Sequence, residues 1–427
     1  MNLKIQRLLS CLVFVMLLLI AIAKCADVLE YKEARIKYTP FYESSTNFDV
    51  IFLGTSHVRN HILPIEMWKD YGIASYNWGY ANCTPAENYY LIQDILKYTS
   101  PKVVVMDVYG LVEYEEFENG KYRTDRIEQQ HVQFDSLPIW SLSKIKASKD
   151  VFDNYENNED FIWNFIMYHN RWTELGKDDF EYEITTEKGA YFITGLGTGS
   201  FTPISEDEKT TIDSVCYPYF LKTIEYCQER GIRVLCVYLP YPAAEKQQRV
   251  ANSIGDIVEK YSNCSYVNML NKNILNLNTD IASDDSHLNY SGAKKVTSWL
   301  GKYLREKYSL DDYSSDLSWE KDYRAYQEYK QKVLKSQTAL ASYLVQLADD
   351  DYIVDAEVYD KKLQNSERLI ELFNNAGIKP RYVNIDTDQC VRIIVKDKNT
   401  DEIIEDASFI SDNFEDSDIF AINKSME

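Results

Sequence analysis

Five short apolar runs, separated by segments with helical character, constrain the fold of this chain most strongly. The runs have the length and composition of β-strands: 48–53, 74–77, 103–108, 232–239 and 265–269. The third run is apolar except for Asp107, as expected of a strand covered on both faces. Alternation of strands and helices is typical of parallel sheets. We therefore predict an α/β domain over residues 48–308, a flavodoxin-like three-layer sandwich around a five-stranded parallel sheet.

The expected helices lie between these runs. They are placed at 63–71, 85–96, 207–229, 243–261 and 290–308. Thr84 is the expected N-cap of the second of them, with Pro85 in its first turn.

The segment Gly54-Thr55-Ser56-His57 follows the first strand directly. A serine on a tight turn at the carboxyl end of a buried strand lies where open α/β sheets bind ligands. The turn also presents the backbone N–H of Ser56 to a developing oxyanion. A Gly-x-Ser string after a strand is common, so this segment alone is weak evidence for a nucleophile.

A second segment far downstream, Asp284-Asp285-Ser286-His287, precedes the last helix of the domain. In a hydrolytic triad an imidazole takes the serine proton, and a carboxylate holds the ring in the useful tautomer. The alternative is that Asp284 caps the helix and His287 is a solvated loop residue. Each segment alone favours a structural role, but the pair at opposite ends of one α/β unit favours catalysis.

With these two segments, the chain resembles the SGNH/GDSL hydrolase superfamily. Gly54-Thr55-Ser56 stands at the position of the family's Gly-Asp-Ser block, and 284–287 at that of its Asp-x-x-His block. Residues 77–84 resemble the second block, Asn-x-x-x-x-Gly-x-Thr. The resemblance implies a nucleophile Ser56, a base His287 and an orienting Asp284. It also implies an oxyanion hole from the N–H groups of Ser56 and of Asn82 or Gly79.

The third block of the family supplies an asparagine after the third strand, and this chain has none in 103–111. That departure resembles the GSSH-like branch of membrane-anchored bacterial proteins related to polysaccharide O-acetylation. The branch implies acetyl groups on a cell-envelope glycan and a membrane-bound O-acyltransferase partner. His57 is one candidate for the missing donor or for a substrate contact, with Asn60 and Asn77 as others, although His57 could equally be a solvent-facing turn residue.

The first 26 residues have the character of a targeting element. Lys4 and Arg7 precede sixteen residues, 8–23, whose only polar members are Ser10 and Cys11. We predict an uncleaved signal anchor with its amino end in the cytoplasm and the remaining chain outside. Cleavage, or lipid attachment at Cys25, is the alternative. Residues 27–47 are expected to form a charged stalk.

Residues 111–205 interrupt the strand–helix alternation and are predicted to form a cap over the ligand edge. Their aromatic residues include Tyr114, Trp140, Trp163, Phe165 and Trp172. Within 168–172, His169 and Arg171 are candidate contacts for a substrate carboxylate or sugar. The alternative is an amphipathic helix that packs Trp172 on the core.

Residues 309–427 are predicted to form an accessory region, with a long charged helix and then a small α+β segment. Asp397-Lys398-Asn399 is expected to be a hairpin turn. The last 27 residues hold nine Asp or Glu and one Lys, which predicts a solvated tail. No chemistry is evident in this region.

Charge and cysteine usage exclude several functions. A net charge of −21 argues against nucleic acid as a partner. The eight cysteines follow no metal or redox spacing, and His57 and His61 lack a paired glutamate, so we predict neither a metal nor a cofactor. The two function classes that remain are a serine esterase or O-acyltransferase, and a non-catalytic carbohydrate-binding or envelope-assembly protein that retains the fold.

Overall fold

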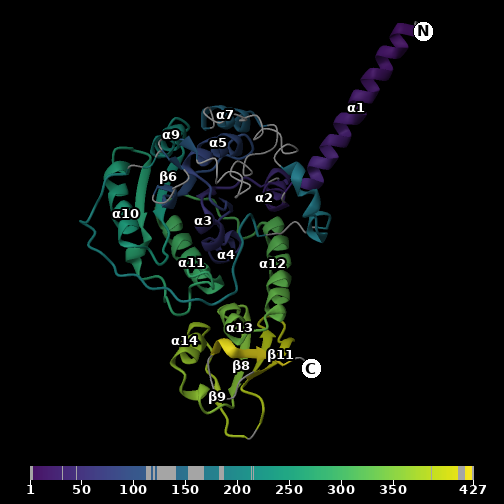
Figure 1. The fold of residues 1–427 in the computed structure, drawn as a ribbon. Helices are drawn as coiled ribbons and strands as arrows, with labels where there is room; N and C mark the ends of the chain where they lie inside the picture. The colour runs from purple at the N-terminus through teal and green to yellow at the C-terminus, as the bar shows by residue number, and fades with distance from the viewer. Residues whose placement is uncertain are drawn as a thin grey trace.

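The computed structural model describes residues 3–30, 32–44, 46–111, 117–118, 121–122, 141–151, 168–181, 187–212, 214, 216–385, 387–411 and 419–425. Its largest part is built on a parallel sheet with the strand order β2-β1-β3-β6-β7 (Figure 1). The strands are β1 (Val50–Gly54), β2 (Ser75–Gly79), β3 (Val103–Asp107), β6 (Arg233–Tyr238) and β7 (Cys264–Asn268). This order confirms the predicted flavodoxin-like sandwich, with five parallel strands between two layers of helices.

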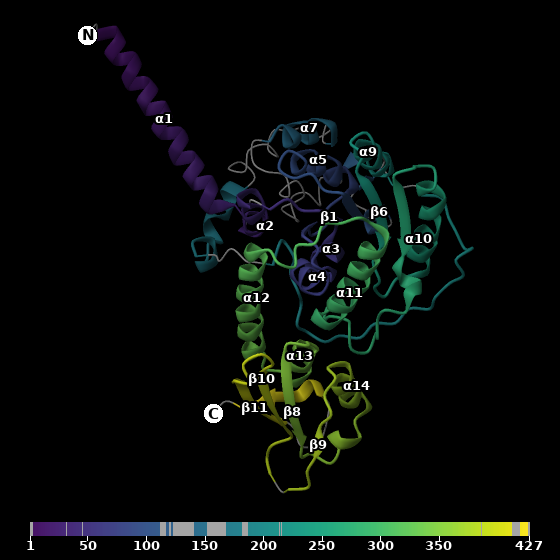
Figure 2. The same ribbon diagram turned by 180° about the vertical axis from the view of Figure 1, so that it is seen from behind.

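Both faces of this sheet are buried, which explains why its strands are nearly continuous apolar runs. On one face, Leu53 and Met106 pack with Leu91 of α5 and Phe220 of α9. On the other, Val50, Phe52 and Val105 pack with residues of α4 and α11. These two helices lie side by side (Figure 2). The helices are α3 (Ser56–His61), α4 (Pro64–Tyr71), α5 (Pro85–Ile95), α9 (Tyr217–Gln228), α10 (Glu245–Val258) and α11 (Tyr290–Lys307).

Two of the helix starts test the capping predictions. Thr84 caps α5 as expected, since its hydroxyl accepts the N–H of Glu87 at 3.1 Å. The helix predicted from residue 207 is wrong in its first half, because α9 begins at Tyr217 with Pro218 in its first turn. The polar residues before it bond to α10 instead: Lys209 pairs with Asp256 at 2.7 Å.

The N-terminal part begins with α1 (Leu3–Leu29), which projects from the rest of the molecule as a long rod (Figure 1). Within the described residues, α1 is the one helix with the length and apolar character needed to cross a membrane. A signal sequence has the same properties.

The predicted stalk is wrong for the segment that forms α2 (Lys32–Glu43). Phe41 is buried, and its ring lies 5.5 Å from that of Phe48 and 5.0 Å from those of Tyr76 and Trp78. An aromatic side chain in such a cluster removes a large apolar area from water, and this outweighs the charged composition of the segment. Helix α2 is therefore part of the fold.

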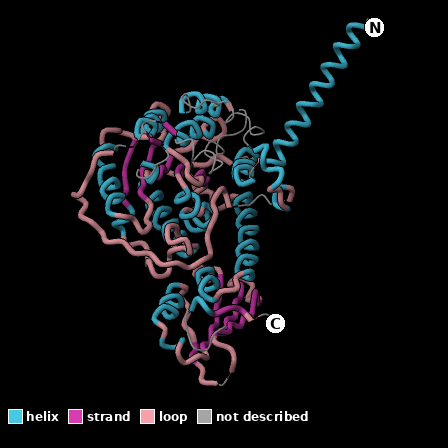
Figure 3. Tube along the Cα trace, in the orientation of Figure 1, coloured by secondary structure: helices cyan, strands magenta, loops and turns pink. Residues whose placement is uncertain are grey.

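The C-terminal part joins the α/β fold through α12 (Leu317–Ser336) and α13 (Leu340–Gln346). It contains α14 (Glu367–Asn375) and a second sheet with the order β12-β11-β10-β8-β9 (Figure 3). These strands are β8 (Tyr352–Val358), β9 (Arg381–Tyr382), β10 (Val391–Asp397), β11 (Ile403–Ser411) and β12 (Ile422–Lys424). The turn predicted at 397–399 connects β10 to β11.

The predicted solvated tail is wrong for the two strands that it contains. Strand β11 pairs along β10, with Val391 opposite Phe409, and Phe409 and Ile422 are buried. Along β11, the buried Ala407 and Phe409 alternate with the exposed or half-buried Asp406, Ser408 and Ile410, so net composition concealed a half-buried strand.

A buried ion-pair network joins α12 to the α/β fold. Lys330 Nζ lies 3.1 Å from Glu66 Oε1, 2.5 Å from Asp349 Oδ2 and 3.0 Å from Asp351 Oδ2. Burial alone would lower the pKa of Lys330, but the carboxylates of Glu66 and Asp349 hold it well above its ordinary value. The hydroxyl of Tyr290, the first residue of α11, lies 2.9 Å from the Glu66 carboxylate and 2.6 Å from that of Asp349.

The remaining described elements are short. They are β4 (Phe117–Glu118), β5 (Lys121–Tyr122), α7 (Leu142–Val151) and the 3₁₀ helices η1 (Tyr109–Leu111), η3 (His169–Thr173), η4 (Lys177–Asp179), η5 (Met269–Lys272), η6 (Leu363–Asn365) and η7 (Ile419–Ala421).

Candidate active site

Ser56 is the first residue of α3, directly after the turn that ends β1. Thr55 caps the helix, because its hydroxyl accepts the N–H of His57 at 3.3 Å. A Cβ on Gly54 would lie 2.5 Å from a methyl of Val58 and 2.9 Å from Cβ of Asp107. Only glycine therefore allows β1, α3 and β3 to meet this closely, and the turn holds Ser56 at the carboxyl edge of the sheet.

Ser56, His287 and Asp284 form one hydrogen-bonded relay. His287 Nε2 lies 2.8 Å from Ser56 Oγ, and Nδ1 lies 2.6 Å from Asp284 Oδ2. A carboxylate can only accept, so Nδ1 carries the proton and Nε2 presents its lone pair to the serine. The sequence places these residues about 230 positions apart, and the fold brings them into contact.

The Asp284 carboxylate is held ionised by its own loop. Its Oδ1 accepts the N–H of His287 at 2.9 Å and that of Ser286 at 3.0 Å. Burial would raise the pKa of Asp284, but these N–H groups and the His287 ring bring it below the usual value. The capping role considered for Asp284 belongs to Asn289, whose side chain accepts from Gly292 N at 3.2 Å.

His57 and His61 lie beneath the relay as a buried, stacked pair. Their ring centroids are 4.9 Å apart, and the His57 ring also lies 4.1 Å from Tyr109 and 4.5 Å from Tyr241. Burial, with His287 as a second cause, lowers the pKa of His57 to about 3, and burial lowers that of His61 well below its usual value. Both rings are therefore neutral, and the solvent-facing alternative for His57 is wrong.

The candidates for the oxyanion hole differ in the hydrogen bonds that they already make. Gly79 N–H donates to Asn77 Oδ1 at 2.9 Å, so the alternative of Gly79 as an oxyanion donor is wrong. The Asn77 amide donates to the carbonyls of Val58 at 2.7 Å and Ile62 at 2.8 Å, which holds α3 against β2. Asn82 adopts the left-handed backbone conformation at φ 55°, as the glycine of the resembled block could.

Asp107 occupies the end of β3, the region where the family's asparagine was sought. Its side chain is buried behind the Ser56 turn, with Oδ1 3.5 Å from the N–H of Leu239. Burial raises the pKa of Asp107 to about 7, although backbone N–H groups and the Thr55 hydroxyl act in the opposite direction. Asp107 supports the nucleophile turn from behind.

The predicted substrate contacts in the insertion do not join this site. Arg171 is buried, donates to the carbonyl of Leu29 at the end of α1 and pairs with Asp179 at 2.8 Å. His169 is exposed on the same 3₁₀ helix. Trp172 is 70% exposed, so the alternative in which it packs on the core is also wrong. Tyr114, Trp140, Trp163 and Phe165 lie outside the described residues.

The last part of the insertion does reach the His287 loop, which sequence reasoning missed. Thr198 N–H donates to Asp285 Oδ1 at 2.8 Å, and Gly197 N–H to the Ile281 carbonyl at 2.9 Å. A Cβ on Gly197 would lie 2.1 Å from the Ala282 carbonyl oxygen. The spacing Gly195-x-Gly197-x-Gly199 was the available signal, since closely approaching backbones need glycine.

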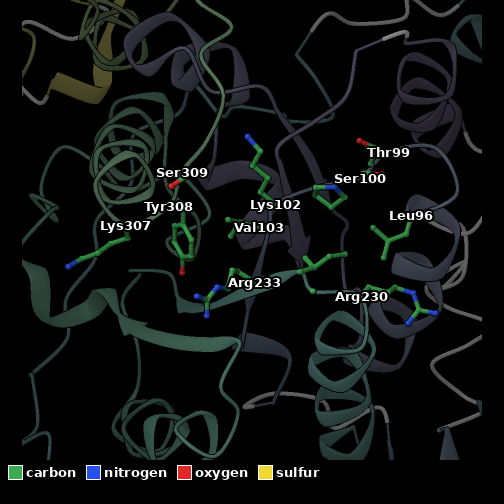
Figure 4. A pocket seen from close by; sticks show the side chains of 13 residues that line it. Leu96, Thr99, Ser100, Lys102, Val103, Arg230, Arg233, Lys307, Tyr308 and Ser309 are labelled. Carbon is green, nitrogen blue, oxygen red and sulfur yellow. The ribbon is translucent and has the colours of Figure 1, made fainter.

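A basic groove of about 660 Å³ lies at the other edge of the sheet, where β3 and β6 begin (Figure 4). Its cations are Lys102, Arg230, Arg233 and Lys307. Lys102 pairs with Asp49 at 3.0 Å and Asp311 at 2.6 Å. Arg230 and Lys307 lie at the carboxyl ends of α9 and α11, where positive charge offsets the helix dipole. The fold therefore explains this groove without a ligand.

Comparison with known proteins found no matching family model and no matching curated protein. Two similar solved structures are a provisionally assigned acylhydrolase from Bacteroides fragilis NCTC 9343 and a provisionally assigned platelet activating factor from Streptococcus pneumonia. The first is 11% identical with a TM-score of 0.33, covering 65% of this chain and 98% of its own. The second is 13% identical with a TM-score of 0.29, covering 68% and 98%. Scores this low carry no argument about activity. Any inference about the chemistry of the site therefore rests on its geometry alone.

Proposed function

We propose that this chain is a serine esterase or O-acyltransferase of the SGNH/GDSL type, with Ser56 as nucleophile. The observation that carries the proposal is the continuous relay from Asp284 through His287 to Ser56, with distances of 2.6 and 2.8 Å. A serine is a weak nucleophile unless an adjacent base removes its proton, and this arrangement supplies that base in the required tautomer.

In the proposed reaction, Ser56 Oγ attacks an ester carbonyl while its proton passes to His287 Nε2. The tetrahedral oxyanion accepts hydrogen bonds from the N–H groups of Ser56 and Asn82. Collapse expels the alcohol, which takes the proton from His287, and leaves an acyl-serine. His287 then deprotonates water or a sugar hydroxyl, which attacks the acyl-serine and regenerates Ser56.

The acceptor determines whether the net reaction is hydrolysis or transfer. We propose an acetyl group and a cell-envelope polysaccharide, on the resemblance to the membrane-anchored GSSH-like branch. In that setting α1 anchors the chain with Lys4 and Arg7 in the cytoplasm and the site outside, and a membrane-bound O-acyltransferase is the proposed acyl source. Exclusion of water from the acyl-serine would then favour transfer.

The absent third-block asparagine bears directly on the rate. Loss of one oxyanion donor typically costs about 3–4 kcal/mol, or roughly 10²–10³-fold in rate. We therefore expect slow hydrolysis of simple esters unless the true substrate contributes a donor.

The test is labelling of the full chain in detergent with a fluorophosphonate, which reacts with activated serines. Wild type is expected to label, and Ser56→Ala and His287→Ala are expected not to. Ser100→Ala removes an exposed serine at the opposite edge of the sheet and should label normally. Absence of labelling in folded wild type would refute the hydrolase proposal and favour a carbohydrate-binding protein, to be followed by glycan-binding measurements.

A further inference from the structure

Residues 168–181, which include η3 and η4, pack against the end of α1. This segment lies beside the base of the α1 rod in both ribbon views (Figures 1 and 2). Arg171 forms this contact, because its guanidinium donates to the carbonyl of Leu29 and pairs with Asp179. Arg171, which was expected to bind substrate, therefore ties residues 168–181 to the end of α1.

Lys32, the first residue of α2, also bonds to the end of α1. Lys32 Nζ lies 2.6 Å from the carbonyl of Asp27, 3.1 Å from that of Val28 and 2.9 Å from that of Glu30. Asp27 and Val28 belong to the last turn of α1, so the lysine caps the end of this helix. The lysine side chain thereby ties the end of α1 to α2.

Two large aromatic side chains of residues 168–181 face solvent at this contact. Trp172 is 70% exposed and Phe180 is 63% exposed. Of the five tryptophans in the described ranges, Trp68, Trp78 and Trp319 are buried and Trp299 is half-buried, so Trp172 stands apart. Exposed aromatic rings next to a membrane-spanning helix are typical of the lipid headgroup layer, where Trp is enriched.

The length of α1 places the rings of Trp172 and Phe180 near the level of the lipid headgroups. A helix rises about 1.5 Å per residue, so the apolar run from Leu8 to Ala23 spans roughly 24 Å. The long side chains of Arg7 and Lys24 at its two ends can reach the interfaces of a hydrocarbon core of about 30 Å. Lys24 then lies at the outer boundary of the core. Leu29 lies five residues further, about 7.5 Å above that boundary, which is the outer limit of a headgroup layer of roughly 5–7.5 Å on each side.

We infer that residues 168–181 form a second membrane contact beside α1, with the rings of Trp172 and Phe180 in the headgroup layer. The segment holds two basic residues against four acidic ones, so the attraction comes from the aromatic rings and requires no anionic lipid. A helix alone leaves the domain free to rotate about the helix axis. A second contact fixes the orientation in which the edge of the sheet that carries Ser56 is held over the bilayer.

The experiment measures tryptophan fluorescence of the full chain in nanodiscs of phosphatidylcholine brominated at acyl carbons 6 and 7. Bromine quenches only rings close to it, and α1 contains no tryptophan. Wild type is expected to be quenched relative to unbrominated nanodiscs. Trp172→Phe should lose most of that quenching, and the control Trp299→Phe, on α11, should retain it. Adding Phe180→Trp to the Trp172→Phe variant should restore quenching.

Two results would overturn the inference. Equal quenching in wild type and Trp172→Phe would mean that the ring does not reach lipid. Loss of wild-type quenching in high salt would mean that the contact is electrostatic rather than aromatic. Neither measurement depends on activity, so the membrane contact and the proposed chemistry can fail separately.

Discussion

The backbone N–H of Leu288 donates to Nε2 of the buried His61 at a distance of 3.0 Å. Since His61 ends α3 and Leu288 follows His287, this bond connects the helix that carries the nucleophile to the loop that carries its base. The bond also assigns the tautomer of His61, because an accepting Nε2 leaves the proton on Nδ1. We therefore infer that the Ser56–His287 distance depends on a second, buried histidine.

Replacement of His61 by alanine is expected to slow labelling of Ser56 and to destabilise the fold. The Leu288 N–H would lose its buried acceptor, which typically costs about 1–3 kcal/mol. His61→Gln places an amide oxygen near the former Nε2 and should recover part of both losses. The measurements are fluorophosphonate labelling rate and thermal unfolding, with His169→Ala as the exposed histidine control. A wild-type labelling rate in His61→Ala would contradict the positioning role.

Asp284→Asn is expected to reduce the labelling rate at neutral pH by about 10³–10⁴-fold, as loss of the orienting carboxylate does in other triads. The amide can no longer hold the Nδ1–H tautomer, whereas the fold should be kept. The neighbour Asp285 provides the control, because in Asp285→Asn the amide oxygen can still accept the Thr198 N–H. Similar rates for the two variants would show that Asp284 is not part of the relay.

Asp107 is expected to make stability fall as the pH rises from about 4 to 7. Its folded pKa is raised to about 7, above the unfolded value near 3.9, so the folded state holds a proton that the unfolded state releases in this interval. The loss is complete above pH 7 and amounts to a few kcal/mol at most. Asp107→Asn should flatten this interval in denaturant unfolding measured against pH. Asp401→Asn, in the exposed β10–β11 turn, should leave it unchanged, and an unaltered slope in Asp107→Asn would disprove the assignment.

Gly54→Ala is expected to destabilise the protein by about 1–3 kcal/mol and to abolish most labelling. The new methyl group would press on Val58 and Asp107 and displace the Ser56 turn. Gly176→Ala is the matched control, since nothing lies within 4 Å of a Cβ at that position. The measurements are the free energy of chemical unfolding and the labelling rate of both variants. Equal stability of Gly54→Ala and Gly176→Ala would mean that the turn has room for the new methyl group.

The sheet and the relay could be predicted because their signals are local. Buried parallel strands are continuous apolar runs, and Ser56 and His287 each follow a short motif at an element boundary. To predict that Ser56 and His287 come together, the only further rule required was that the carboxyl ends of parallel strands meet at one edge of the sheet.

Predictions failed where distant partners determine the role of a residue. Gly79 N–H is occupied by Asn77, and Arg171 bonds to the end of α1, neither of which leaves a pattern in the neighbouring sequence. Phe41 and Phe409 lie in charged segments, and a prediction from average composition overlooked these single buried rings. In each case a tertiary contact overrode the local preference.

The network around Lys330 has a consequence for dividing this protein into parts. A chain ending at residue 309 would lack Lys330 and Asp349, leaving the buried Glu66 carboxylate without its cation and Tyr290 without one of its acceptors. Removing one partner of a buried ion pair is far more costly than never having built the pair. We therefore expect the α/β region and the C-terminal sheet to unfold together, and shortened proteins for biochemistry should retain residues through 425.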